Sequence, residues 1–315
     1  MENRKIYMNG KFVDECEAKI SIFDSSLMFG DMVFEMTRSF NGKHFKLKEH
    51  IDRLFMGLKI LRIEIPESKE DVYNLCIKTA ELNQDAFSED DEHRLLIDVS
   101  RGVLGIYEQI NGIHQGYNLI IADFPLKWTV QGMGKLFTTG INNVITNQKV
   151  IPSHLMDPKI KNRSRLFYLM ANIEASLFKG ENNWPLMLDT DGYIAEGSGD
   201  NFFIVKNNTV ISPEGRNMLR GISRDYVIND LCKTLNVNVI EKNIEPYDVY
   251  EADEAFICAT PFCMLPVTSL NSLKVGDGKP GKIFNKLIQL WSKKTGVDII
   301  KQIESWNKEI ENTKN

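Results

Sequence analysis

The chain contains little cysteine, no long apolar run and no large excess of charge of one sign. Its 315 residues include five cysteines, and 38 basic residues against 43 acidic ones leave a formal net charge of −5. An odd, scattered set of cysteines does not indicate a disulfide framework, and the N-terminus does not have the pattern of a signal peptide, so we expect a cytoplasmic protein. Without a basic stripe no nucleic-acid partner is expected. The apolar stretches, such as 119–122, are too short to cross a membrane.

Several common site motifs are also absent. The chain has no G-x-G-x-x-G after a predicted strand, no phosphate-binding G-x-x-x-x-G-K-[ST] and no H-E-x-x-H. It has no cysteine and histidine cluster at zinc-binding spacing, so no metal is expected. The five histidines are isolated from one another in the sequence. These absences argue against the usual dinucleotide, P-loop and zinc enzymes.

Periodicity predicts a mixture of strands and helices without regular alternation, which favours an α+β fold. Asn9-Gly10 predicts a tight hairpin within 5–13, and a strand over 33–40 should turn at Asn41-Gly42. Helices are predicted over 68–83, 165–179, 222–235 and 282–295. The proline and glycines near 125–134 indicate a boundary. We therefore predict a small N-terminal domain (1–125), a linker (126–134) and a large C-terminal domain (135–315).

Six separated segments follow one another in a recognisable order. They are F-G-D-M-V-F-E (29–35) followed by Arg38, H-I-D-R-L (50–54), D-P-K-I-K-N-R-S-R (157–165), G-Y-I-A-E-G-S-G-D-N (192–201), L-R-G-I-S-R-D (219–225), and E-A-F-I-C-A-T (254–260) continuing to Val267. Together they resemble the class IV aminotransferases, which are fold-type IV enzymes dependent on pyridoxal 5′-phosphate (PLP). The resemblance covers nearly the whole chain and implies the two-domain α+β fold of D-amino acid aminotransferase-like enzymes.

The resemblance implies that Lys161 supplies the amine that binds the cofactor aldehyde and later moves a proton at the substrate. Lys159 is a rival, because two residues apart in a strand point to the same face. The residues after Lys161, and not those after Lys159, match the family.

The other cofactor residues follow from the same resemblance. Glu196 would face the pyridine nitrogen and keep it protonated. The phosphate would be bound by Arg53, by the helix start at Gly221, Ile222 and Ser223, and by Thr260.

Substrate choice rests on fewer positions. Phe34 matches branched-chain aminotransferases, and Ile106-Tyr107-Glu108 stands where D-amino acid enzymes carry Arg-x-His. The chain departs from the branched-chain pattern at Met36, at Leu166, which replaces a tyrosine, and at Pro261, which has no N–H for the substrate carboxylate. Arg165 and Tyr168 are candidates to replace the tyrosine. Candidate carboxylate partners are Arg38, Arg94, Arg101 and Arg163.

We therefore predict reversible ping-pong transfer of an amino group from a branched-chain or other hydrophobic L-amino acid to 2-oxoglutarate. An (R)-amine or D-amino acid transaminase is the alternative, followed by a PLP lyase similar to aminodeoxychorismate lyase. A non-catalytic binding protein on the same scaffold is the hypothesis from another class. The resemblance further implies a homodimer or a higher homo-oligomer, with the active site between domains.

Overall fold

The computed structural model describes residues 3–313. The chain divides into two compact units, each with its own internal contacts. Unit 1 contains the residues up to Thr129 together with Ile160–Arg165, and unit 2 contains Val130–Lys159 and the residues from Leu166 onward. The predicted boundaries assigned 135–315 to one domain, whereas the structure packs 160–165 with unit 1. The predicted linker 126–134 contains a short helix, α4 (Lys127–Val130), whose Val130 is buried.

Unit 1 is built on an antiparallel sheet with strand order β2-β1-β7-β6-β3. Its strands are β1 (Lys5–Met8), β2 (Lys11–Asp14), β3 (Met32–Met36), β6 (His93–Ser100) and β7 (Asn118–Pro125), with a separate hairpin of β4 (Ser39–Phe40) and β5 (Lys43–His44). The helical segments are α1 (Ser25–Phe29), α2 (Leu47–Leu61), α3 (Lys69–Asn83), η1 (Gln84–Ala86) and η2 (Gly105–Tyr107). The predicted hairpin is confirmed, because Asn9 and Gly10 both have positive φ between β1 and β2.

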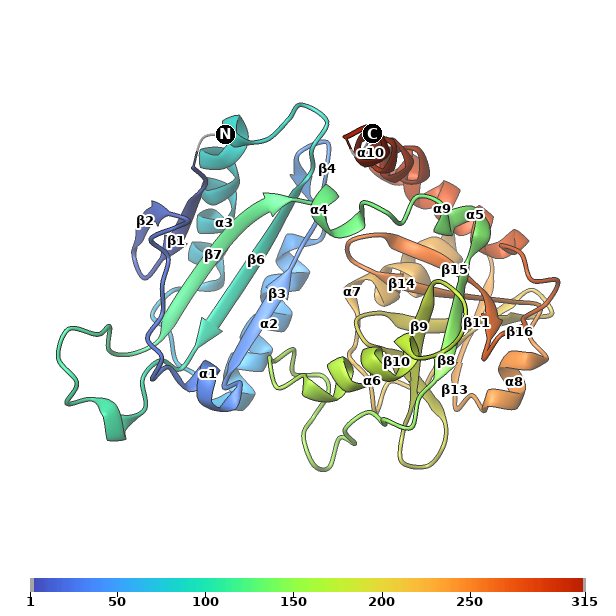
Figure 1. Cartoon of the computed structure of the whole chain (residues 1–315), viewed down its shortest axis with the longest axis horizontal. Helices are drawn as coiled ribbons and strands as arrows, with labels where there is room; N and C mark the ends of the chain where they lie inside the picture. The colour runs from blue at the N-terminus through green and yellow to red at the C-terminus, as the bar shows by residue number, and fades with distance from the viewer. Residues whose placement is uncertain (1–2, 314–315) are drawn as a thin grey trace. The chain divides into compact units, whose positions relative to one another are not determined.

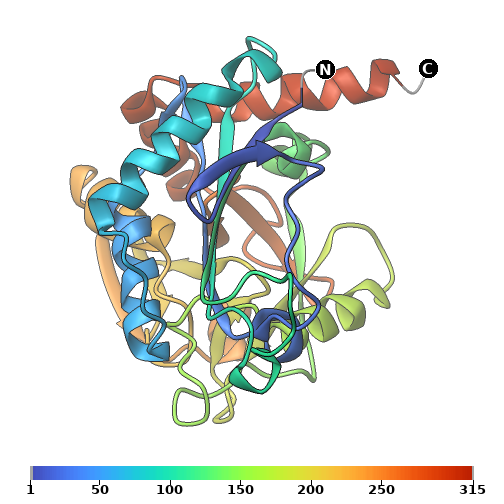
Figure 2. The same ribbon diagram turned by 90° about the vertical axis from the view of Figure 1, so that its left-hand side faces the viewer.

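Helices α2 and α3 cover one face of this sheet (Figure 1; seen from the side in Figure 2). The inward residues of β6, Leu95, Ile97 and Val99, join the apolar faces of both helices in one buried cluster. The intervening residues of β6 point to the opposite face, since side chains alternate along a strand. That second face carries several of the predicted site residues.

Of two local predictions for unit 1, the structure confirms one and divides the other into two strands. The predicted helix over 68–83 is confirmed, and Ser68 and Asp71 form a reciprocal capping box at its start. The predicted strand over 33–40 is interrupted, because β3 ends at Met36 and the chain resumes as β4 at Ser39. Between them the Thr37 N–H still donates to the Leu95 carbonyl at 3.0 Å.

Unit 2 is built around a closed circuit of strands. Its strands are β8 (Ile141–Ile145), β9 (Asn183–Leu188), β10 (Ile194–Gly197), β11 (Asn201–Lys206), β12 (Thr209–Pro213), β13 (Asn238–Lys242), β14 (Glu254–Ala259), β15 (Cys263–Leu270) and β16 (Leu273–Lys274). Pairing runs β10-β9-β8-β15-β14-β11, and β10 also pairs with β11, which closes a barrel. The closing pair is Glu196 opposite Asn201.

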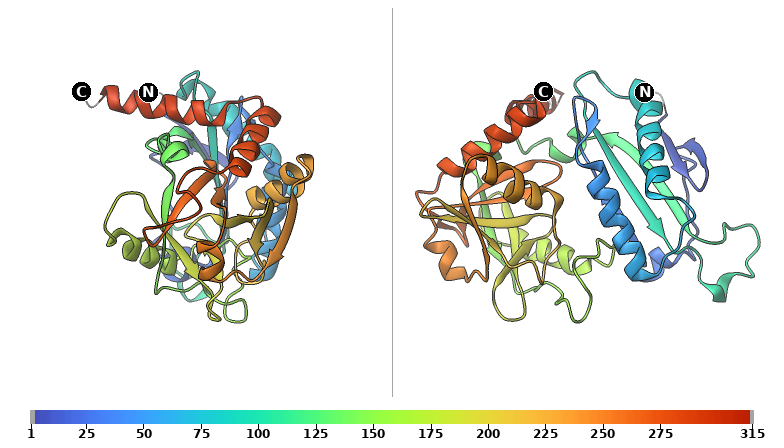
Figure 3. Two further views of the ribbon diagram at one scale, coloured as in Figure 1. Left: turned by 90° about the vertical axis from the view of Figure 1, so that its right-hand side faces the viewer. Right: turned by 180° about the vertical axis from the view of Figure 1, so that it is seen from behind.

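Helices pack around this barrel. They are α5 (Leu136–Thr139), α6 (Leu166–Ser176), α7 (Ile222–Tyr226), the π-helical η3 (Val227–Cys232), α8 (Pro246–Tyr250), α9 (Lys282–Thr295) and α10 (Ile299–Thr313). The predicted helix 165–179 is shorter in the structure, and the predicted helix 222–235 widens into a π-helix after Tyr226. Helices α9 and α10 follow one another at the C-terminal end (Figure 3, left).

Membrane-spanning helices and metal-binding clusters are both missing from residues 3–313. No helix there is both long and apolar enough to cross a membrane. No group of three or more histidine, cysteine, aspartate or glutamate side chains within that range could hold a metal ion.

Candidate active site

The segment carrying Lys161 lies along the edge of β3 in unit 1. The Phe34 N–H donates to the Lys161 carbonyl at 2.9 Å, and Asn162 forms a β-bridge with Val33. The Ser164 hydroxyl donates to the Phe29 carbonyl at 2.9 Å. Gly30 permits this contact, since a Cβ there would lie 2.5 Å from the Ser164 hydroxyl and its φ is +69°. The edge of β3 thus fixes the backbone at Lys161.

The Lys161 side chain lies over a buried aromatic ring. Its Nζ is 4.6 Å from the centroid of the Phe34 ring, and Phe34 is only 1% exposed. The rival Lys159 lies in unit 2, where its Nζ pairs with Asp157 at 2.8 Å and donates to the Arg216 carbonyl at 3.1 Å. The two lysines therefore differ in surroundings, and those of Lys161 are shared with a predicted substrate residue.

Arg53 is held by a buried carboxylate of β3. Its Nε and Nη2 donate to the two oxygens of Glu35 at 2.6 and 2.8 Å, and the His50 Nδ1 lies 2.7 Å from the same carboxylate. Burial alone would raise the pKa of Glu35, but Arg53 and His50 outweigh it and lower that pKa to about 2. For His50, whose charged form is the protonated one, burial lowers the pKa. A neutral His50 can therefore donate from Nδ1 to the charged Glu35, which orients Arg53.

The four candidate carboxylate partners are placed very differently. Arg101 donates to both oxygens of Asp31, at 2.6 and 3.0 Å, and to the Leu61 and Arg62 carbonyls that end α2. Because the Arg101 guanidinium already donates to these intramolecular acceptors, we withdraw Arg101 as a substrate-binding candidate. Arg38 is fully buried over the Phe40 ring and donates to the Ser39 carbonyl.

Arg94 is a buried cation with spare donors. It lies on β6, is 7% exposed, and its Nη2 has one weak contact with the Met36 sulfur at 3.4 Å. Within the described part of the chain, its Nε and Nη1 are buried without a hydrogen-bond partner. Burial, and then the nearby Arg38, lower the pKa of Arg94 to about 10. Such a group calls for an anionic partner.

Glu196 stands at the closing strand pair of the unit 2 barrel and is 3% exposed. The Tyr168 hydroxyl donates to its Oε1 at 2.6 Å, and the Leu219 N–H donates to its Oε2 at 3.0 Å. The Asn201 amide lies 3.5 Å from Oε2 and donates to the Leu219 carbonyl at 2.9 Å. Three elements therefore fix the direction of this carboxylate.

Asp200 is a second acid beside Glu196. It is 8% exposed, and its Oδ1 is buried with no partner among the described residues. Burial, followed by the charge of Glu196, raises the pKa of Asp200 to about 8. The carboxyl occupies the space left by Gly197, where a Cβ would lie 2.4 Å from Oδ1. Asp200 is thus predominantly protonated at neutral pH.

The predicted phosphate-binding residues of unit 2 lie at a helix start and a hairpin tip. Gly221 is the N-cap of α7 without a side-chain cap, and a Cβ there would lie 2.1 Å from Asn201 Oδ1. The Ile222 and Ser223 N–H groups donate to no acceptor in the described residues. Thr260 and Pro261 follow β14 in the hairpin to β15. The unused N–H groups suit an anion.

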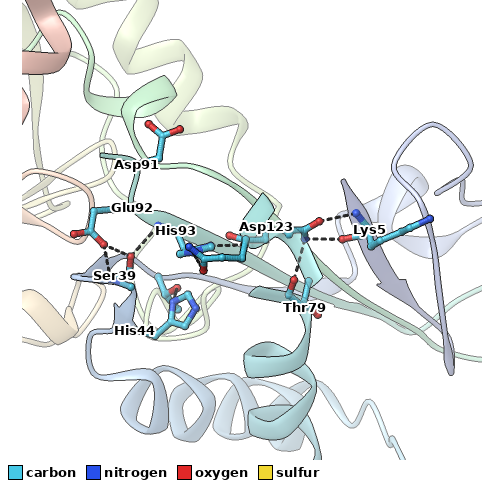
Figure 4. Close-up of polar contacts among 12 residues, drawn as sticks. Lys5, Ser39, His44, Thr79, Asp91, Glu92, His93 and Asp123 are labelled. Atoms are coloured by element: carbon cyan, nitrogen blue, oxygen red, sulfur yellow. Dashed lines mark hydrogen bonds and ion pairs between the residues drawn. The ribbon is translucent and has the colours of Figure 1, made fainter. Parts of the chain in front are cut away.

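Another buried polar cluster in unit 1 lies outside the predicted site (Figure 4). Glu92 accepts hydrogen bonds from the Ser39 hydroxyl and from the Asn41 and Gly42 N–H groups, which hold the β4–β5 turn. The His93 Nδ1 lies 2.7 Å from Asp123 Oδ2. These contacts join β6 and β7 to the turn, and we assign them to the fold.

Three residues of interest were missed or misread in the sequence. Tyr168, a sequence candidate to replace the missing tyrosine, donates a hydrogen bond from its hydroxyl to Glu196. His50 and Arg53 are three residues apart, which places them on one helix face; that spacing was the available signal. Asp98 interrupts the apolar run 95–99, and a charged residue inside such a strand was the signal for it.

Comparison with known proteins gives a consistent result. The family model "Amino-transferase class IV" matches residues 32–270. A Methanocaldococcus jannaschii protein named "Putative branched-chain-amino-acid aminotransferase" is 36% identical over 90% of this chain and 93% of its own length. The D-alanine aminotransferase of Listeria monocytogenes is 29% identical over 90% and 94% of the two chains.

The fold is shared with solved structures. The T.th. branched-chain amino acid aminotransferase with pyridoxamine 5′-phosphate superimposes with a TM-score of 0.82 at 26% identity, covering 94% of this chain and 95% of that one. The predictions of a fold-type IV architecture and of transaminase function are therefore confirmed. The chain belongs to the class IV aminotransferase family and is a PLP-dependent transaminase.

Proposed function

We propose that this transaminase moves the amino group of a branched-chain or other hydrophobic L-amino acid to 2-oxoglutarate. The observation that carries this proposal is the second face of the unit 1 sheet. Phe34 and Met36 lie there opposite Asp98 and Leu96, and Arg94 follows on the same strand. The apolar Phe34, Met36 and Leu96 suit the hydrophobic side chain. The Nε and Nη1 of Arg94, which have no hydrogen-bond partner among the described residues, suit the distal carboxylate of the acceptor.

The donor set fits PLP. We assign the cofactor amine to Lys161, the phosphate to Arg53, Thr260 and the N–H groups of Ile222 and Ser223, and the pyridine nitrogen to Glu196. Two features support the fit. Gly221 leaves no room for a Cβ beside the unused N–H groups, and Glu196 is held in one direction by three donors.

Each residue would have a distinct chemical task. PLP supplies the aldehyde that accepts the amino group and the ring that withdraws electrons from the substrate α-carbon. Lys161 Nζ would hold the cofactor at its aldehyde carbon, and as a free amine it would accept the proton that leaves the substrate α-carbon. Glu196 would keep a proton at the pyridine nitrogen. Arg53, oriented by Glu35, anchors the phosphate so that Lys161 and the substrate keep their positions.

A half-reaction screen tests the substrate class. L-leucine, L-glutamate, D-alanine and (R)-1-phenylethylamine are each added to the PLP form, and conversion to the pyridoxamine form is followed by absorbance. We expect conversion by L-leucine and L-glutamate. Conversion by D-alanine or the amine alone would instead identify a D-amino acid or (R)-amine transaminase, an alternative kept open by the similarity to D-alanine aminotransferase.

Arg94 gives a sharper test of the acceptor. Replacing it by methionine should raise KM for 2-oxoglutarate by about 10-fold or more and leave KM for L-leucine within about two-fold. Arg216→Met is the matched control, because Arg216 is an exposed cation paired with Glu214 at 3.7 Å. An equal loss for both substrates would contradict the assignment of Arg94.

We also infer a homodimer in the cytoplasm. The outer face of α6 is apolar, with Leu166 and Leu169 exposed at 69% and 54%. Exposed apolar faces of this kind mark protein interfaces. The five cysteines are all free, which fits a reducing compartment. Light scattering of the wild type and of Leu169→Glu tests the assembly, and a wild-type monomer would rule it out.

A further inference from the structure

Arg163 and Lys161 both lie over the ring of the buried Phe34. The Arg163 guanidinium carbon lies 3.7 Å from the centroid of the Phe34 ring, the same ring that the Lys161 Nζ approaches at 4.6 Å. A guanidinium stacked on an aromatic face is held flat and keeps its edge donors available. The two cations therefore share one platform, two residues apart in the chain.

Asp98 fixes Arg163 from the adjacent strand. It stands opposite Phe34 in the β3–β6 register, and its Oδ1 accepts from Arg163 Nη2 at 3.1 Å. Burial raises the pKa of Asp98, and Arg163 partly offsets that shift. Arg163 Nε and Nη1 have no acceptor among residues 3–313. A guanidinium needs further acceptors to satisfy all five of its donors.

A cavity adjoins this pair within unit 1. Its volume is about 300 Å³, and Asp98 and Arg163 form part of its wall. The rest of the wall is mixed, with the apolar Ile20, Leu27, Met32 and Ile120 and the polar Ser26, Ser100 and Asn118. The size of this cavity and its mixture of apolar, polar and charged residues are typical of small-molecule sites. Arg163 lines this cavity and its side chain is 35% exposed, so it is accessible to a ligand.

We propose that Arg163 binds the α-carboxylate of the amino-acid substrate, with Asp98 as its positioning residue. This inference rests on the transaminase activity proposed above. It also accounts for Pro261, which has no N–H to offer a carboxylate. A planar guanidinium can bind a carboxylate with two parallel hydrogen bonds, and the stacking on Phe34 and the bond to Asp98 leave such an edge open.

A pair of isosteric ligands isolates the carboxylate contribution. The holoenzyme is titrated with 4-methylpentanoate and with the uncharged 4-methylpentanamide, and binding is followed by the absorbance of the bound cofactor. Arg163→Met should lower the affinity for 4-methylpentanoate by about 10-fold or more and leave the affinity for the amide within about two-fold of wild type. Arg163→Lys should recover part of the affinity, because lysine keeps the charge but not the planar fork.

Asp98→Asn is expected to lower the affinity for 4-methylpentanoate by a smaller factor, about three- to ten-fold. Arg163 remains in this variant, but no negative charge holds it in place. In steady state, Arg163→Met should raise KM for L-leucine more than it lowers kcat. Arg216→Met is again the charge-matched control. If the Met variant loses cofactor, the Lys and Asn variants carry the same test on holoenzyme.

The outcomes separate the two proposals. The role of Arg163 is overturned if the affinities for the acid and the amide fall equally, or if all three variants bind the acid as wild type does. Either result leaves the transaminase proposal intact. A wild-type holoenzyme that neither converts L-leucine nor binds 4-methylpentanoate overturns both.

Discussion

The Tyr168 hydroxyl donates a hydrogen bond to Oε1 of Glu196 across 2.6 Å. The carboxylate is buried, so this donor offsets part of the cost of burying its charge. Tyr168→Phe should weaken PLP binding by about 10-fold, the usual value for one hydrogen bond to a charged group. Cofactor titration of the apoenzyme measures this, and unchanged affinity would show that Leu219 and Asn201 suffice to orient Glu196.

Glu35 should make stability depend on pH in the acid range. Its pKa in the folded chain is about 2, below its usual value, so its stabilising effect is complete above about pH 5 and is lost as the pH falls toward 2. Glu35→Gln should lower the free energy of unfolding at pH 7 by about 3 kcal/mol, because it breaks a buried ion pair. Urea unfolding at pH 7 and pH 3 should show the difference from wild type shrinking at pH 3. A constant difference would contradict the ion pair.

Asp200 should make the stability of the fold depend on pH in the opposite sense, with a loss of stability as the pH rises. Its pKa is raised to about 8, so the unfolded chain loses this proton near pH 4 while the folded chain keeps it. The group therefore destabilises the fold increasingly as the pH rises from 4 to 8. Asp200→Asn should raise the free energy of unfolding by roughly 1–3 kcal/mol at pH 9 relative to its effect at pH 4. Parallel unfolding curves at both pH values would refute the burial of a neutral acid.

Gly221 should tolerate no side chain. A Cβ there would lie 2.1 Å from Asn201 Oδ1, so Gly221→Ala must displace the amide that also contacts Glu196. The expected result is a loss of about 1–3 kcal/mol in stability, together with weaker PLP binding. Gly199→Ala is the matched control, because a Cβ at Gly199 meets nothing within 4 Å. Equal behaviour of the two variants in thermal unfolding would contradict this packing.

The fold could be predicted largely from local patterns and the six family segments. The Asn9-Gly10 turn and the Ser68–Asp71 capping box are decided by neighbouring residues, so the sequence contained the necessary information. The return of 160–165 to unit 1 depends on a strand edge formed more than a hundred residues earlier. Long-range pairing of this kind leaves no periodic signal.

The sequence motifs propose residue types for the site, but they do not show the partners of those residues. Lys161, Glu196 and Arg53 were named from the motifs, whereas the donors that orient them come from packing. Arg101 and Arg163 looked alike as sequence letters. Only the structure shows that Arg101 donates its hydrogen bonds to Asp31 and to the end of α2, whereas Arg163 has donors without an acceptor among the described residues and lines a cavity.

Borohydride reduction of the holoenzyme, followed by peptide mass spectrometry, tests the assignment of Lys161 most directly. Reduction couples the cofactor to the lysine that binds it. We predict a single pyridoxyl label on Lys161, and its loss in Lys161→Ala but not in Lys159→Ala. A label on Lys159, or a protein that takes up no PLP, would contradict the assignment.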